Sequence, residues 1–140
     1  MANSAFIPLQ GCQKSADERQ TIFAAGSFRL FQGSLVPTPS TTDAEYAAAE
    51  ADYDTYAPIV VAAWFEPMLA PTSGYSIASE AVQFDVGVAD PVTPNSIGGA
   101  GYEDEAGVAR LAAIFDPALP MQMAGQAIPL QFFDFFPTGL

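Results

Sequence analysis

The stretch 82-VQFDVGV-88 decides the fold class, because its apolar and polar residues alternate. A period of two places every second side chain on the same face of a β-strand, so that one face is buried and the other meets solvent. Further short apolar runs, separated by Pro and Gly, lie at 57–65, 75–78, 97–102, 108–115 and 127–136. Runs of this length and spacing are typical of an all-β sandwich or barrel.

Two of the remaining segments need an interpretation of their own. The longest apolar run, 59-IVVAAWF-65, is long enough for a helix, but its β-branched start and aromatic end favour a strand buried on both faces. The segment 95-NSIGGAGYEDEAG-107 is rich in glycine, yet it has no Lys, and its acidic run Glu103-Asp104-Glu105 would repel a phosphate. We expect a flexible hairpin loop there.

Short helices are predicted only in the N-terminal third. Residues 13–25 contain good helix formers, with Gly26 as the expected end, and residues 27–31 then read as a strand. A second helix is expected at 43–52, because Thr42 and Glu45 have the spacing of a capping box.

The chain length of 140 residues fits one domain with a core of its own. The sequence therefore predicts an N-terminal arm, residues 1–12, followed by a single domain, residues 13–140. The expected class is mainly β, with a β-sandwich-like or jelly-roll-like architecture and one or two short helices near 13–25 and 43–52.

The charge balance excludes several kinds of partner. Sixteen acidic residues against four basic ones give a formal net charge of −12. Nucleic acid and anionic membrane surfaces attract Lys and Arg, so neither is an expected partner. No stretch approaches the roughly 20 apolar residues that a membrane span requires.

The residues that most enzymes use are scarce. The chain has no His and a single cysteine, Cys12, so it has neither a histidine general base nor an intramolecular disulfide. We expect Cys12 to fill apolar space, because no His exists to activate its thiol. We therefore expect no enzyme activity and assign no catalytic residue and no cofactor.

Acidic clusters leave calcium open as an alternative. The densest are Asp52-x-Asp54 and Glu103–Glu105, but neither has the ligand spacing of an EF-hand loop. Solvated surface loops explain such clusters equally well, so no metal ligand is assigned.

Four phenylalanines near the C-terminus give the strongest functional signal: Phe132, Phe133, Phe135 and Phe136. In a strand over 131–136, both faces are aromatic. One interpretation places all four in the core of the monomer. The other packs one face on the core and the second face on a neighbouring subunit, because aromatic residues are enriched at the centres of interfaces.

Several segments together resemble small virion structural proteins of tailed bacteriophages. The resemblance begins with 28-FRLFQ-32, the linker 36-VPTP-39, the acidic helix 43–52 and Tyr56-Ala57. It continues with the Gly/Tyr segment 95–102, the run 111–115 before a proline, and a closing strand over 127–135.

The resemblance implies a capsid decoration (cement) subunit with a β-sandwich or jelly-roll-like fold. Such a subunit would bind and stabilise the shell of the major capsid protein. It would associate with copies of itself, in many cases as a trimer. It would belong to the surface of the virion and be assembled in the host cytoplasm. Two alternatives stay open: a tail or head-fibre component that engages the host surface, and a Ca²⁺- or carbohydrate-binding β module.

Overall fold

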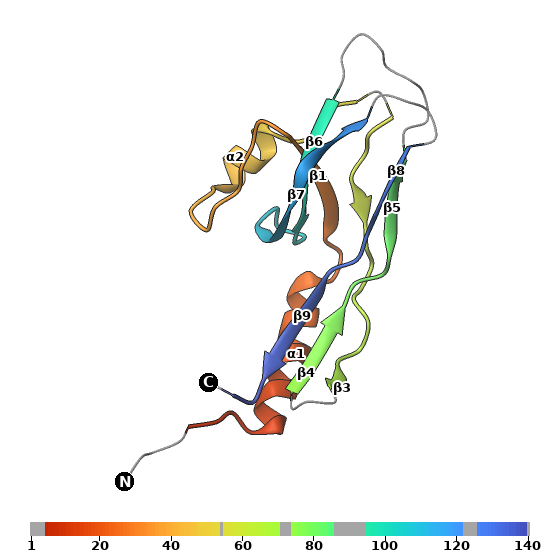
Figure 1. Ribbon diagram of the computed structural model, residues 1–140. Coiled ribbons are helices and arrows are strands. Elements are labelled where there is room, and N and C mark those ends of the chain that lie inside the picture. Colours follow the sequence, from red (N-terminus) through yellow and green to blue (C-terminus); the bar gives the residue numbers. More distant parts are fainter. Residues whose placement is uncertain (1–4, 54, 71–73, 86–94, 122–125, 140) are drawn as a thin grey trace.

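The computed structural model describes residues 5–53, 55–70, 74–85, 95–121 and 126–139. These residues form antiparallel strands and two helices (Figure 1), which confirms the prediction of a mainly β protein with two short helices. The jelly-roll arrangement remains a prediction. The helices are α1 (Leu9–Phe23) and α2 (Asp43–Ala48). The strands are β1 (Ser27–Gln32), β2 (Ile59–Val60), β3 (Met68–Ala70), β4 (Gly74–Ala78), β5 (Val82–Asp85), β6 (Asn95–Glu103), β7 (Ala109–Met121), β8 (Ala127–Leu130) and β9 (Phe133–Pro137).

The strands form three pieces of sheet, in the orders β2-β1-β6-β7, β3-β4-β9 and β5-β8. Figure 1 shows an elongated arrangement, in which α1 lies with β3, β4 and β9 at one end, and the four-stranded sheet lies with β5 and β8 at the other. Within the described segments, neither helix is both long enough and apolar enough to cross a membrane.

The β4-β9 and β5-β8 pairs are two halves of one long ribbon. Ala78 pairs with Phe133 and Val82 pairs with Leu130, so three residues on one side oppose two on the other. One extra residue of this kind is a β-bulge, which bends the ribbon. Buried Ser79 bridges the bend, because its backbone N–H donates to Phe132 O and its hydroxyl accepts from Phe132 N, both at 2.9 Å.

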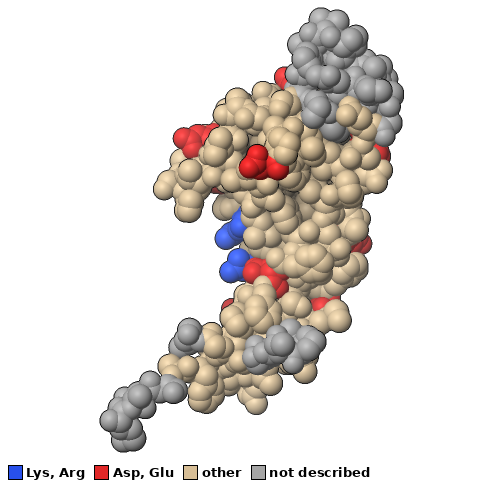
Figure 2. Space-filling model, viewed as in Figure 1, with Lys and Arg blue, Asp and Glu red and all other residues tan. Residues whose placement is uncertain are grey.

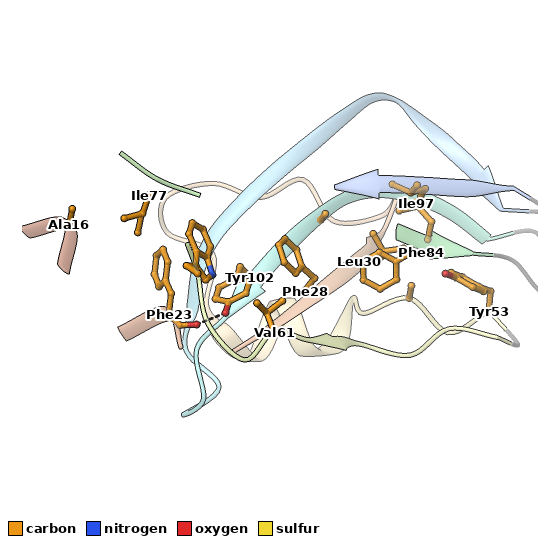
Figure 3. Packing of buried hydrophobic residues seen from close by; sticks show 14 residues of the cluster. Ala16, Phe23, Phe28, Leu30, Tyr53, Val61, Ile77, Phe84, Ile97 and Tyr102 are labelled. Atoms are coloured by element: carbon orange, nitrogen blue, oxygen red, sulfur yellow. Dashed lines mark hydrogen bonds between the residues drawn. The ribbon is translucent and has the colours of Figure 1, made fainter. Parts of the chain in front are cut away.

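The core lies between the four-stranded sheet and this ribbon (Figure 3). Phe28 and Leu30 of β1, Ile97 of β6 and Phe84 of β5 are buried in one cluster. Phe132, between β8 and β9, stacks on Phe28 with ring centroids 5.4 Å apart. At the α1 end, the Tyr102 hydroxyl donates to the Phe23 carbonyl, which ties β6 to the last turn of the helix.

The prediction of a doubly buried strand over 59–65 is wrong. Only Ile59–Val60 forms a strand, and Val60 is 72% exposed. Beyond Val60 the chain keeps the register of the β1–β2 pair, because Val61 N donates to Gly26 O and Ala25 N donates to Ala62 O, but it runs beside the turn after α1 and is no longer a regular strand. Of the residues after Val60, Val61 and Trp64 are buried, and the centre of the Trp64 ring lies 4.6 Å from that of Phe23.

The prediction of a flexible loop over 95–107 is also wrong, because β6 occupies its first nine residues. The glycines allow close approach of neighbouring strands. A Cβ on Gly99 would lie 2.2 Å from Ala113 O on β7, and one on Gly101 would lie 2.4 Å from the Phe31 ring. Only residues 104–108 form the turn.

Helix boundaries differ from the prediction by a few residues. α1 begins at Leu9, within the segment expected to be an arm, and ends at Phe23, before Gly26. α2 has the predicted capping box, in which Thr42 Oγ1 accepts from Glu45 N and the Glu45 carboxylate accepts from Thr42 N. It is shorter than expected and buries none of its residues.

Two of the prolines that separate the apolar runs 108–115 and 127–136, Pro117 and Pro120, lie within β7. The pairs Ile97–Leu119 and Gly99–Ile114 enclose one residue of β6 but four of β7, so β7 bulges around Pro117. β7 is also an edge strand, where a proline whose nitrogen faces away from β6 removes no hydrogen bond between the strands.

Candidate functional site

The structure separates the four predicted interface residues into two pairs. Phe132 and Phe136 are half-buried and pack against the core, whereas Phe133 and Phe135 are 67% and 47% exposed. The predicted alternation of two aromatic faces is therefore present, although residues 127–136 form two strands, β8 and β9, and not one. Only Phe133 and Phe135 are placed to contact another molecule.

Phe133 and Phe135 belong to a larger apolar surface on the sheet β3-β4-β9. Residues that lie opposite each other in an antiparallel pair point to the same face. Phe135 lies opposite Ser76, which lies opposite Met68, and Phe133 lies opposite Ala78. We call these five residues the outer face. Met68 is 67% exposed, so three of the five are large apolar side chains in contact with solvent.

Helix α1 covers the other side of β4 and β9, and Figure 1 shows these two strands in front of it. Ile77 of β4 and Ala16 of α1 are fully buried in the same cluster. Arg19 of α1 pairs with Asp134 of β9 at 3.6 Å, and its guanidinium lies 5.8 Å from the centre of the Phe136 ring. The helix therefore holds the sheet that presents the outer face.

Close packing with Gly74 orders the Phe135 ring. A Cβ on Gly74 would lie 2.9 Å from two atoms of that ring, so the ring crosses directly over the glycine backbone. An aromatic ring that is positioned before binding loses less conformational freedom when a partner arrives. This arrangement suits a contact surface better than a mobile side chain would.

The free edge of β9 is poorly suited to pairing with another strand. The Phe135 N–H, which points away from β4, donates to Asp134 Oδ1 at 3.0 Å. Pro137 at the end of β9 has no N–H to offer. Edge strands with occupied or missing donors resist the addition of a further strand. A partner would therefore contact the side chains of the outer face.

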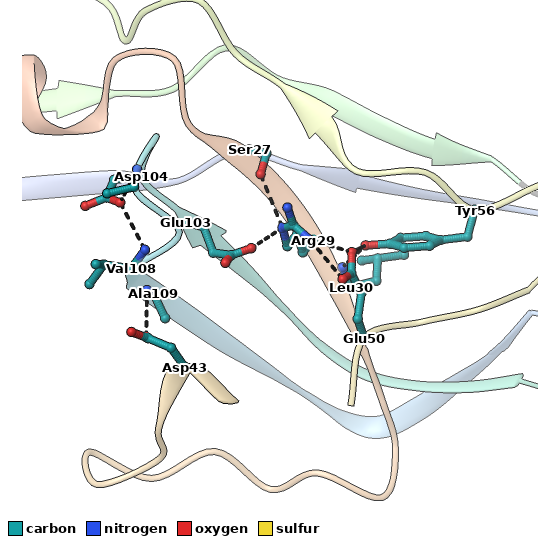
Figure 4. Close-up of polar contacts among 11 residues, drawn as sticks. Ser27, Arg29, Leu30, Asp43, Glu50, Tyr56, Glu103, Asp104, Val108 and Ala109 are labelled. Atoms are coloured by element: carbon teal, nitrogen blue, oxygen red, sulfur yellow. Dashed lines mark hydrogen bonds and ion pairs between the residues drawn. The ribbon is translucent and has the colours of Figure 1, made fainter. Parts of the chain in front are cut away.

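A polar cluster on the four-stranded sheet is the second feature with potential chemistry (Figure 4). Arg29 of β1 donates to both carboxylate oxygens of Glu50, at 3.0 and 2.8 Å, and also pairs with Glu103 of β6. The Tyr56 hydroxyl donates to Glu50 at 2.7 Å and accepts from Leu30 N at 3.2 Å. The cluster therefore links the segment after α2 to β1 and β6.

The ionisation states of Tyr56 and Glu103 are consistent with a structural role for this cluster. Burial and the hydrogen bond to Glu50 raise the pKa of Tyr56 far above its ordinary value, so the phenol stays neutral. Burial also raises the pKa of Glu103, and the neighbouring Arg29 offsets part of that rise. The cavity beside Arg29 and Tyr46 has room for about one water molecule. This space is too small for an organic substrate.

The predicted acidic clusters are not brought together as a cation site. Asp104 closes the β6-β7 turn, because its carboxylate accepts from Ala106 N, Val108 N and Arg110 Nε. Burial alone would raise the pKa of Asp104, but these donors lower it on balance. Across the described residues, no group of three or more Asp, Glu, His or Cys side chains converges on one point. Asp54 lies outside those residues.

Sequence reasoning missed Met68 as a member of the outer face. The short strand β3 lies between Pro67 and residues outside the described part, and its three residues carry no alternating pattern that could be recognised. Only its pairing with β4 reveals the contribution of Met68.

No protein-family model, no curated protein and no solved structure matches this chain.

Proposed function

We propose that the protein is a structural subunit of a tailed-phage virion, of the capsid decoration type, which binds the shell of the major capsid protein through the outer face. The observation that carries this proposal is the exposure of Phe133, Phe135 and Met68 together on one side of a sheet that α1 supports from behind. Clustered aromatic and methionine side chains are enriched at interface centres. The sequence resemblance to small virion proteins supports the choice of a capsid as the partner.

The arrangement of the polar groups favours a binding role over a catalytic one. Arg29, Glu50 and Tyr56 are engaged with one another, and Asp104 is engaged with its own turn. These groups stabilise the fold and do not line a substrate-sized cavity.

A binding assay with empty shells tests the proposal. The purified chain is mixed with expanded and with unexpanded capsids of its phage assembled without it, and bound protein is measured after sedimentation of the shells. We expect saturable binding to expanded shells. The double variant Phe133→Ser/Phe135→Ser should bind at least about tenfold more weakly, because aromatic residues at interface centres each contribute about 1–2 kcal/mol or more.

The matched control is Ile114→Ser on β7, which removes an apolar side chain of similar exposure, 57%, outside the outer face. This variant should bind like the wild type. Absence of wild-type binding to either shell contradicts the proposal. Binding to host cells without binding to shells would favour a tail or head-fibre component.

A further inference from the structure

We propose that the outer face docks a different protein, whose contact surface has an apolar centre bordered by Lys or Arg, and that it does not pair with a second copy of this chain. This inference deepens the proposed function and rests on it only for the identity of the partner as a capsid protein. Two observations support it. Exposed carboxylates lie beside the outer face, and the arginines of this chain are already paired with its own carboxylates.

Two exposed carboxylates lie beside the outer face. Phe65 N donates to Ala78 O at 2.8 Å, which places the next residue, Glu66, beside the Ala78 end of the face. Glu80 follows Ser79 at the bulge, on the same end of β4. Both carboxylates are exposed, and neither forms an ion pair with any residue in the described ranges. Charges at the rim of an interface select a partner of opposite sign.

Figure 2 shows the surface on the side of β4 and β9. Over the α1 end, this surface is largely uncharged, and both acidic and basic side chains appear at its border towards the rest of the molecule. A partner that covers the uncharged area therefore brings its rim close to charged side chains, among them the carboxylates of Glu66 and Glu80, which have no ion-pair partner in the described ranges.

The chain cannot supply the complementary cations itself. It has four basic residues. The three arginines are paired internally: Arg19 with Asp134, Arg29 with Glu50 and Glu103, and Arg110 with Asp104.

The fourth cation, Lys14, lies on α1, on the opposite side of the sheet. In a two-fold pair the same patch of both copies meets. Glu66 and Glu80 of both copies would then border one interface without a cation between them. The net charge of −12 on each copy adds to the repulsion.

The test uses two synthetic peptides with the same apolar centre, one flanked by lysines and the other by glutamates. Binding is followed by the change in backbone amide NMR signals of the intact protein. We expect the lysine-flanked peptide to shift the signals of Phe133, Phe135 and Met68, and to lose affinity as salt is added. The glutamate-flanked peptide should bind more weakly.

Charge-neutralised variants identify which carboxylates are responsible. Glu66→Gln/Glu80→Gln should weaken binding of the lysine-flanked peptide by about 3- to 10-fold, the range expected for two exposed ion pairs. The matched control is Asp17→Asn/Glu18→Gln on α1, which changes the net charge equally and should leave binding within about twofold of the wild type, since it removes no rim pair.

Three results of the peptide experiment overturn the inference: no shift with either peptide, equal shifts with both, or equal effects of the two double variants. Sedimentation of the wild type as an oligomer that Phe133→Ser/Phe135→Ser dissociates would also overturn it, because the face would then pair with itself. Failure to bind capsids contradicts the proposed function and leaves the peptide result standing. Capsid binding that is insensitive to Glu66→Gln/Glu80→Gln contradicts this inference alone.

Discussion

Replacement of Ser79 by alanine tests the bend that joins the two halves of the long ribbon. The Ser79 side chain is fully buried, and its hydroxyl accepts from Phe132 N and donates to Glu80 O, each at 2.9 Å. Ser79→Ala removes one oxygen and leaves the Phe132 N–H buried without its side-chain acceptor. An unsatisfied buried donor costs about 1–3 kcal/mol. We expect a loss of about 2 kcal/mol in the free energy of unfolding, which for a chain of this size lowers the melting temperature by about 6–8 °C.

Urea unfolding measures this loss, and the fluorescence of Trp64, the single tryptophan of the chain, reports it because that residue is buried. Hydrogen exchange gives a local readout, since the Phe132 amide should lose protection more than the amides of β6. The control Ser76→Ala makes the same change on the outer face and should alter stability by less than about 0.5 kcal/mol. An unfolding midpoint equal to that of the wild type, with the Phe132 amide still protected, would refute the reasoning.

Three further predictions concern the four-stranded sheet and α2. Gly99→Ala should cost about 2 kcal/mol or more in thermal unfolding, because its Cβ would lie 2.2 Å from Ala113 O, whereas Gly139→Ala, with no atom within 4 Å, should be neutral. Thr42→Ala should cost about 1 kcal/mol in urea unfolding and Thr42→Ser much less, since only alanine removes the capping oxygen; equal losses would contradict the capping role. Asp104→Asn should destabilise the protein at pH 7. Because the folded state holds the pKa of Asp104 below 3.8, its stabilising effect is present above that value and is lost as the pH falls through the lower, folded-state pKa. The difference from the wild type should therefore close in acid, and a difference that stays constant between pH 7 and pH 2 would argue against the charge.

The sequence predicted those elements whose signal is local. The alternation of Val82, Phe84 and their neighbours identifies a strand with one buried face, and the described part of it, β5, buries Phe84 and exposes Gln83 and Asp85. The capping box at Thr42 likewise involves atoms only three residues apart. Such features depend on neighbours along the chain, so one sequence is sufficient to recognise them.

Elements that depend on distant partners were predicted poorly. The run 59–65 has the composition of a buried strand, but beyond Val60 the segment that faces it is the turn after α1, where Ala25 has a positive φ, so the regular strand ends. The glycines of 95–103 suggest a loop, whereas their actual role is to let β1 and β7 approach β6 closely. In both segments, residues far away in the sequence determine the outcome.

The four C-terminal phenylalanines also combine a local feature that the sequence predicts with a long-range one that it does not. Alternation alone separated Phe132 from Phe133, because it depends only on the period of a strand. Which of the two faces α1 covers could not be read from the sequence, since it depends on the packing of residues 9–23 against β4 and β9.

The burial of Cys12 makes the protein convenient for labelling. Its thiol is the only one in the chain, is 1% exposed, and donates to Pro137 O at 3.4 Å beneath the end of β9. A maleimide or spin-label reagent should therefore leave the native protein unmodified. One cysteine introduced at Ala78 would then carry the sole reactive group, and a fluorophore attached there would report directly when another molecule covers that side of the sheet.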